Sequence, residues 1–238
     1  MSIPGLSAWL TTAQGRYVLD CEQARIDAAV SDVFGFNALQ LGLPQIDFLR
    51  ANRIPLRQRA GESGPVDVLC NLDALPFAAH STDLVVLPHV LEFHHDPHQI
   101  LREIERILIP EGQLIILGFN PISLWGLKSR VGRTGDFPWN GSYISLLRLR
   151  DWLKLLGFEV DRSTFGCCVP PCNQEQWLRR WHFMEAAGER WWGLPGGIYI
   201  LRAIKRVHGM RLITPKWKTT PVGAKALRPV AQKESNDR

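Results

Sequence analysis

The chain lacks the long apolar stretches and the N-terminal pattern that mark membrane spans and secretory signals. None of its apolar runs approaches the length of about 20 residues that crosses a bilayer as a helix. Its first residues lack the succession of charged, apolar and small residues of a signal peptide. We therefore expect a cytoplasmic protein, and 238 residues with 45% hydrophobic content allow one sizeable core plus extensions.

Cysteine is scarce, and its arrangement argues against both disulfides and zinc. The chain has five cysteines, and an odd number without a secretory signal favours reduced thiols. Cys167, Cys168 and Cys172 lie close together, but their spacing matches no zinc pattern, with only His182 nearby. We expect a strand followed by a turn at this place.

Several catalytic motifs are also missing. The sequence contains no serine elbow, no cysteine–histidine pair and no P-loop. It also lacks the glycine-rich turn and the ribose-binding acid that dehydrogenases need for a dinucleotide. We see no internal repeat and no second domain.

The most informative stretch runs from Asp73 to Gly118. It contains two buried strands, 83–87 and 113–119, with a helix between them. Asp96, Pro97 and Gln99 form a capping box with proline at the first helical position. The helix then shows one apolar stripe, made of Ile100, Leu101, Ile104, Ile107 and Leu108. Strand, helix and strand in this order predict a right-handed crossover and an α/β fold.

Other patterns place the remaining elements. Residues 1–17 are expected to be an irregular leader with one anchor, Trp9. Helices are predicted at 19–33, at 146–156 between Ser145 and Gly157, and from 173 to 188. Strands are predicted at 38–41, 158–165 and 198–204.

In this central stretch the sequence resembles the class I S-adenosylmethionine (SAM)-dependent methyltransferases, in particular their small-molecule branch. The matching segments lie within about a fifth of the chain and are Asp73 with 75–77, 83–86, 90–97, 106–108 and 110–112. The resemblance implies a Rossmann-like fold whose mostly parallel sheet ends in an antiparallel edge. It also implies transfer of a methyl group from SAM to a small, partly apolar acceptor.

The resemblance is incomplete at the first strand. Members of the family carry an acidic residue there, followed by a glycine-rich turn that lets the backbone approach the cofactor. In this chain Gln40 occupies the position of the acidic residue. Gly42 occupies the position of the first glycine of the turn, and Pro44 and Ile46 occupy the positions of its second and third glycines. An ordinary turn without a ligand and a modified cofactor turn both remain open.

The region around the second and third strands is shortened. Strands predicted at 54–59 and 65–70 are separated only by residues 60–64. Because parallel neighbours need a crossover of about a dozen residues, we predict an antiparallel hairpin. Its turn would lie at the sheet edge opposite Asp73, which excludes Glu62 as a ribose ligand.

The resemblance implies roles for several residues. The Asp73 carboxylate would accept a hydrogen bond from the adenine amino group, and the Ala74 N–H would donate one to the adenine ring. The side chains of Leu75 and Phe77 would pack against the adenine. The residues that would line the methionine end of SAM are Leu87, Pro88 and His89, with Gly42 at the turn.

No catalytic residue is assigned, and the candidates near the acceptor are His89 and Asn120. Two of the candidate residues have structural alternatives. Asp73 could be a turn residue that caps the N–H of Leu75 or Phe77, and Asn120 could begin an Asn-Pro turn. We expect no metal, because His94 and His95 precede the helix cap, His98 points from its first turn, and the family carries histidines here without metal.

We expect a domain of residues 1–208, with a substrate lid at about 120–143, and a basic flexible tail of residues 209–238. From Lys205 onward the chain holds nine Lys or Arg and two Asp or Glu, a net charge of +7. Such a segment is either a solubilising tail or an arm for weak contact with anionic membranes; we expect no nucleic acid partner. The alternative to an active enzyme is a methyltransferase-like scaffold that has lost SAM and serves as a binding or assembly protein.

Overall fold

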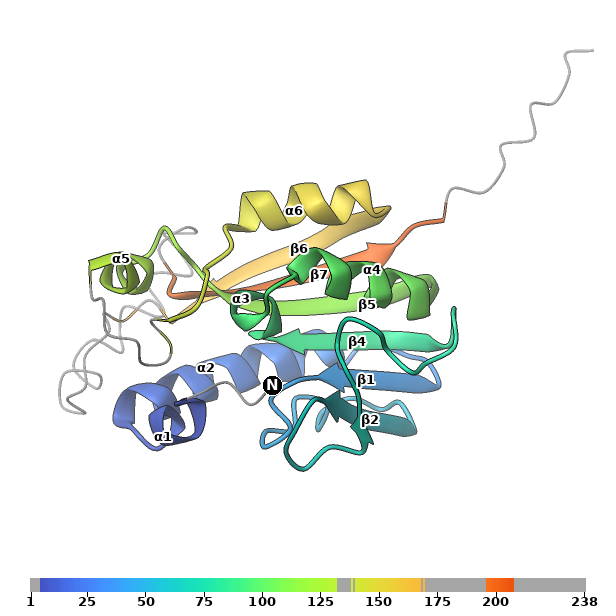
Figure 1. The fold of residues 1–238 in the computed structure, drawn as a ribbon, viewed down its shortest axis with the longest axis horizontal. Coiled ribbons are helices and arrows are strands. Elements are labelled where there is room, and N and C mark those ends of the chain that lie inside the picture. The colour runs from blue at the N-terminus through green and yellow to red at the C-terminus, as the bar shows by residue number, and fades with distance from the viewer. Residues whose placement is uncertain (1–4, 132–137, 139, 168, 170–195, 208–238) are drawn as a thin grey trace, which may run out of the picture. The chain divides into compact units, whose positions relative to one another are not determined.

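A computed structural model of the chain describes residues 5–131, 138, 140–167, 169 and 196–207. These residues form one seven-stranded sheet with helices on both faces (Figure 1). The predicted tail, the helix predicted at 173–188 and residues 132–137 and 139 of the lid lie outside this description. No described helix combines the length and the apolar character that crossing a bilayer requires.

The sheet has the mixed topology that the resemblance predicted. Its order is β3-β2-β1-β4-β5-β7-β6, with the strands from β3 to β5 parallel and β7 antiparallel to both β5 and β6. The parallel strands end at a common edge, here called the carboxyl edge, where Figure 1 shows α1, α3 and α5. The strands are β1 Asn37–Leu41, β2 Leu56–Gly61, β3 Val68–Leu69, β4 Thr82–Pro88, β5 Leu108–Phe119, β6 Phe158–Gly166 and β7 Ile198–Lys205.

Helices cover both faces of the sheet, which explains the continuous apolar runs in β4 and β5. Successive side chains of a strand point to opposite faces. In β4, Val85 and Leu87 therefore join the core beneath α4 and α6, whereas Leu84 and Val86 join the core beneath α2. The helices are α1 Leu6–Leu10, α2 Ala13–Val30, α3 Val90–Phe93, α4 Pro97–Ile107, α5 Leu124–Val131 and α6 Leu146–Leu155.

The predicted helix ends are largely confirmed. Asp96 caps α4 by accepting from the backbone N–H groups of His98 and Gln99, each at 3.1 Å. The Gln99 side chain does not return to the cap; it donates to the Asp73 carbonyl oxygen, 3.1 Å away. Ser145 caps α6, and Gly157 follows the helix with φ of 82°. The Gln99 contact anchors the Asp73 segment to α4.

Two segments expected to be irregular are partly helical. The predicted leader contains α1 and the start of α2, which Thr12 caps by accepting from the Gly15 N–H at 3.0 Å. Gln14, Gly15 and Glu22 are among the buried residues of α2, so its inner face lacks a regular apolar pattern. The predicted lid contains α5, whose Trp125 is buried.

The predicted antiparallel hairpin is wrong, because β3 runs parallel to β2. The prediction assumed two strands of full length. Instead β3 has two residues, and they pair with Ala60 and Gly61 at the very end of β2. To start β3 parallel to β2, the chain therefore has to return along β2 by only two residues. Residues 62–67 are long enough for this connection. Glu62 directly follows β2 and so lies at the carboxyl edge, not at the opposite edge.

Candidate functional site

A hollow at the carboxyl edge lies between the ends of β1 and β2 and helix α3. Its lining includes Gly42, Glu62, Ser63, Val90 and His94. Gly42 has φ of 80°, and a Cβ atom added there would lie 2.5 Å from Cγ2 of Val90. Only glycine suits this position, since it tolerates both the left-handed backbone and the close approach of α3. The glycine that remains from the family pattern thus shapes the hollow.

Gln40 holds the turn that follows Gly42. Its fully buried amide Nε2 donates to three carbonyl oxygens of the turn, those of Gly42, Leu43 and Ile46, at 2.8 to 3.1 Å. Its Oε1 accepts from the Phe48 N–H at 3.0 Å. An acidic side chain could not donate these bonds. Gln40 therefore belongs to the scaffold of the turn, and its amide N–H groups have no capacity left to donate to a ligand.

The described crossover from β1 to β2, residues 42–55, contains turns and no helix. Buried Asn52 supports it by donating to the carbonyls of Val30 and Val33 and by accepting from the Ile54 N–H. In Rossmann-type sites, a helix after the first strand points its free N–H groups at the ligand. This chain lacks that contribution, which should weaken the binding of a cofactor.

The Asp73 carboxylate lies beside this hollow and takes no part in capping its own turn. The Oδ1 atom of Asn71 accepts from the Asp73 N–H at 2.9 Å, and Glu103 accepts from the Leu75 N–H at 2.9 Å. Asn71 and Glu103 thus cap this turn, which was the structural role considered as the alternative for the Asp73 side chain. The Oδ1 atom of Asp73 is buried and accepts no hydrogen bond from the described residues. It has the capacity to accept one from a ligand.

These groups fit the adenosine half of SAM. Adenine and ribose carry N–H and O–H donors, and the carboxylates of Asp73 and Glu62 are acceptors at the same edge of the sheet. The Oγ atom of Ser63 is also buried without a hydrogen bond to the described residues. Because buried polar groups are nearly always hydrogen-bonded, the unused atoms of Ser63 and Asp73 make this edge the candidate place for a polar ligand.

Two of the implied adenine contacts have other partners in the structure. The Ala74 N–H donates to the Asn71 carbonyl oxygen at 3.3 Å. The Leu75 side chain is buried in the core beneath α4, and Phe77 packs against the same core. Leu87 and Pro88 are buried where β4 ends, and neither is among the residues that line the hollow.

His89 lies in a buried triad with two glutamates, here called the Glu22–His89–Glu92 triad. Its Nε2 lies 2.7 Å from a Glu22 oxygen and its Nδ1 lies 2.9 Å from a Glu92 oxygen, with all three side chains at most 5% exposed. The other Glu92 oxygen accepts from the Phe119 N–H. The triad therefore joins α2, α3 and the ends of β4 and β5, and both ring nitrogens of His89 are engaged.

The surroundings favour a charged imidazole at His89. Burial alone would lower the pKa of His89, but the two carboxylates outweigh burial and raise the pKa to about 10. Burial also raises the pKa of Glu92, against the opposing effect of His89. A histidine that holds its proton so firmly is a poor general base near neutral pH.

Asn120 also has a structural role. Its Nδ2 donates to the Gly196 carbonyl at 3.0 Å, and its Oδ1 accepts from the Ile122 N–H at 3.0 Å. Asn120 thus ties the end of β5 to the segment before β7 and begins the turn that leads into α5. This is the alternative that the sequence left open, and the structure brings neither Asn120 nor His89 into the hollow.

An aromatic cluster surrounds the end of β5. Phe119 lies between Trp9, Trp125 and Tyr143, with ring centroids 5.2 to 6.4 Å apart, and it also packs against the His89 ring at 4.4 Å. These rings come from α1, β5, α5 and the segment before α6. The part of the carboxyl edge beyond β4 is therefore apolar, with the charged triad beneath it.

Sequence reasoning missed Glu22, Glu92 and the structural role of Gln40, and it excluded Glu62. For Glu62 a signal existed, since it follows Gly42 by 20 residues, the spacing expected of a ribose acid. Glu22 stands 67 positions before His89, and no local pattern connects them. Such a pair becomes visible only in the folded structure.

Comparison with known sequences points to one family. The model of a family described as "Methyltransferase domain" matches residues 43–116. The uncharacterized protein YafS of Escherichia coli is 29% identical over 233 residues, which cover 97% of this chain and 87% of YafS. The ubiquinone/menaquinone biosynthesis C-methyltransferase UbiE of Xanthomonas oryzae is 35% identical over 133 residues, about half of each chain (52% and 53%).

Solved structures agree on the fold. A SAM-dependent methyltransferase from Thermotoga maritima superposes with a TM-score of 0.58 at 19% sequence identity. The superposition covers 80% of this chain and 94% of that one. Identity this low supports the architecture alone, and the sheet order and antiparallel edge described above are part of that shared architecture.

Proposed function

Since this chain belongs to the class I SAM-dependent methyltransferases, we propose that it transfers a methyl group from SAM to a small, partly apolar acceptor. One observation carries the proposal. The hollow at the carboxyl edge combines the Gly42 turn with Glu62, and Asp73 lies beside it next to His94, so that the two carboxylates suit the ribose and the adenine of the cofactor.

Glu62 would accept from the ribose hydroxyls, because it follows β2 at the carboxyl edge. Asp73 would accept from the adenine amino group through its unused Oδ1. The Gly42 turn, held by Gln40, would let the backbone approach the cofactor closely. With fewer glycines and no helix after β1, we expect weaker SAM binding than is usual in the family.

The reactive methyl group belongs to the bound sulfonium, so the chain's own task is to position the acceptor in a dry site. The aromatic cluster around Phe119 provides apolar surroundings at the end of β5. The matched relative from Xanthomonas is named for ubiquinone and menaquinone biosynthesis, and a partly apolar acceptor is consistent with that likeness. His89 and Asn120 would act by holding the edge, since their polar atoms are engaged in it.

Calorimetric titration with SAM and with S-adenosylhomocysteine tests the proposal. We expect both to bind, and Glu62→Ala to weaken both. Asp151→Ala is the matched control, because Asp151 is an exposed acid on α6. No binding heat and no thermal stabilisation at millimolar ligand would instead favour the scaffold alternative.

We further propose that the basic tail attracts the protein weakly to anionic membranes. The net charge of +5 on residues 209–238 supports this, since each Lys or Arg near an anionic leaflet contributes about 1 kcal/mol. A partly apolar acceptor would be consistent with such a location.

A further inference from the structure

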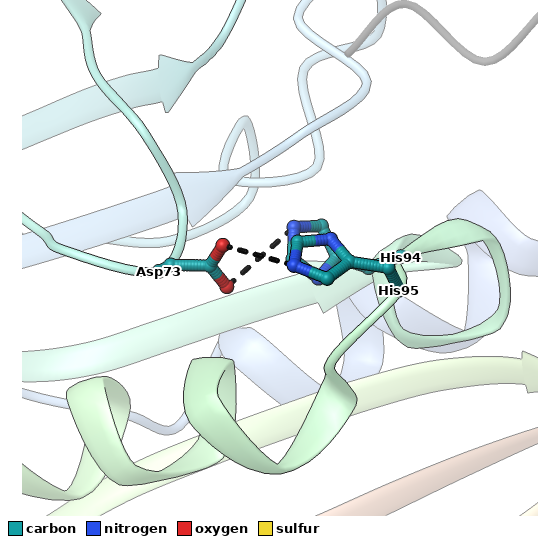
Figure 2. Close-up of side chains that lie close together, drawn as sticks. All are labelled: Asp73, His94 and His95. Atoms are coloured by element: carbon teal, nitrogen blue, oxygen red, sulfur yellow. Dashed lines mark ion pairs between the residues drawn. The ribbon is translucent and has the colours of Figure 1, made fainter.

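Two histidines from one loop face the carboxylate of Asp73. Figure 2 shows Asp73, on the segment after β3, opposite the rings of His94 and His95, which lie between α3 and α4. The Nε2 atom of His94 is 3.6 Å from Asp73 Oδ1, and that of His95 is 3.5 Å from Oδ2. The ring centroids of the histidines are 4.3 Å apart. Three side chains from two separate parts of the sequence thus converge on one point.

The spacing of these atoms suits a transition-metal ion. One ligand atom from each residue lies within 4.8 Å of the others. Bonds of about 2.0–2.2 Å from zinc to imidazole nitrogen and carboxylate oxygen put neighbouring ligand atoms roughly 3.3–3.6 Å apart. The two nitrogen–oxygen distances, one to each Asp73 oxygen, are close to this value, so small side-chain movements would bring both nitrogens and the carboxylate around one ion.

Contrary to the expectation of no metal from the sequence, we propose that Asp73, His94 and His95 form a binding site for one divalent transition-metal ion of the zinc type. Two imidazoles and one carboxylate are a donor set for zinc, nickel or copper, whereas magnesium prefers oxygen ligands alone. The His94 side chain is 4% exposed and that of His95 is 72% exposed. One ligand is therefore fixed by packing, and the other leaves the ion open to solvent and to further ligands.

One contact limits the affinity. The Asp96 N–H donates to Nδ1 of His94 at 3.2 Å, which leaves the proton of a neutral His94 ring on Nε2. Binding an ion at Nε2 moves this proton to Nδ1 and breaks that hydrogen bond. We therefore expect micromolar binding of zinc, not the much tighter binding of a structural site.

The site shares Asp73 with the proposed adenine contact. An ion held by Asp73 removes the acceptor that adenine would use, so metal and cofactor exclude each other. Zinc would then inhibit cofactor binding without contacting the methyl group or the acceptor. This consequence rests on the proposed function, whereas metal binding itself does not.

The test uses the full chain without any histidine tag. Zinc is titrated by calorimetry and cobalt by visible absorption, with magnesium as the negative control. We expect one zinc ion per chain and no magnesium binding. His94→Ala and His95→Ala should each lower zinc affinity at least about 10-fold. His98→Gln should not change it, because His98 is exposed on the first turn of α4 and outside the cluster.

The outcomes separate the alternatives. His95 is exposed, so its replacement should leave the fold intact and keep the test valid should His94→Ala unfold. Unchanged zinc affinity in His95→Ala, or no zinc binding by the wild-type chain, overturns the proposal. An intense near-ultraviolet band with cobalt would place the ion on a cysteine and also overturn it. Zinc binding that saturating S-adenosylhomocysteine does not weaken would disprove the shared Asp73 but not the metal site.

Discussion

The polar side chains at the carboxyl edge differ in whether their bonding capacity is used within the protein. Gln40, His89 and Asn120 bond to neighbouring groups through both ends of their side chains. Ser63 and Asp73 each have a buried oxygen that accepts no hydrogen bond from the described residues. The first group holds the edge together, and the second can bind a ligand. Position in a family motif alone did not separate these two roles.

Asp73→Ala should reduce SAM affinity without unfolding the protein. The change removes a charge-assisted hydrogen bond to adenine, a loss of about 1.5–3 kcal/mol, or roughly 10- to 150-fold in affinity. Calorimetry gives the affinity, and circular dichroism reports whether the fold is intact. Equal affinity of the variant and the wild type would mean that Asp73 does not contact the cofactor.

The Glu22–His89–Glu92 triad should make stability depend on pH. The pKa of His89 is about 10 in the folded chain and 6.5 in its ordinary state. The stabilisation is therefore complete below about pH 6.5 and is lost as the pH rises through 10. Urea unfolding between pH 6.5 and 9.5 should show this decline, and Glu22→Gln should reduce its slope, because it removes one of the carboxylates that raise the His89 pKa. An identical slope in both proteins would contradict the charged triad.

His89→Gln should be severely destabilising. It leaves the buried carboxylates of Glu22 and Glu92 without a cation, and breaking a buried ion pair in this way costs about 3–5 kcal/mol. The free energy of unfolding at neutral pH measures the effect. Arg206, an exposed partner of Glu159, offers a control, since Arg206→Gln should cost at most about 1 kcal/mol.

At the scale of elements, sequence patterns predicted the parts of the fold that depend on local order. The caps of α4 and α6 and the strands β4, β6 and β7 follow from residues that are close in sequence. The parallel pairing of β3 with β2 could not be predicted, because it depends on where along β2 the returning chain begins to pair. A strand of two residues also has too few side chains to show a hydrophobic pattern in the sequence. Helix α2 was only partly predicted, since polar Gln14 and Glu22 occupy its buried face.

The candidate site was predictable to the same degree. Asp73 and Gly42 became candidates through a motif, whereas Glu62 was excluded because the direction predicted for β3 was wrong. His94 and His95 lie beside Asp73 in the structure, although they are far from it in the sequence. A periodic pattern of residues cannot predict a contact of this kind.

The turn after β1 gives a prediction for one element. Gln40→Glu should destabilise the chain more than Gln40→Met, although glutamate is closer to the family pattern. A carboxylate there would face the carbonyl oxygens of Gly42, Leu43 and Ile46, whereas methionine only leaves them unpaired, at about 1–3 kcal/mol for each group. Urea unfolding measures both variants, and a Gln40→Glu variant as stable as the wild type would show that Gln40 does not hold the turn.

At the scale of the whole molecule, charge separates the folded domain from the sequence after it. The chain has a net charge of +5, and residues 209–238 hold seven Lys or Arg and two Asp or Glu, so they carry all of this charge and residues 1–208 are neutral overall. The pI of about 9.1 therefore reflects the last residues, not the surface around the proposed site. Attraction to anionic surfaces and binding of the cofactor should then be separable properties.

Removal of residues 209–238 tests this separation. The full chain should sediment with anionic vesicles at low salt and less so at physiological salt, because a shorter Debye length weakens the attraction of the basic residues. Trp217, between Lys216 and Lys218, could add an interfacial contact. The truncated chain should lose vesicle binding and keep its SAM affinity, because the residues of the hollow all precede residue 209. Equal sedimentation of both forms would show that the tail is not the anchor, and weaker SAM binding after truncation would show that the tail contributes to the cofactor site.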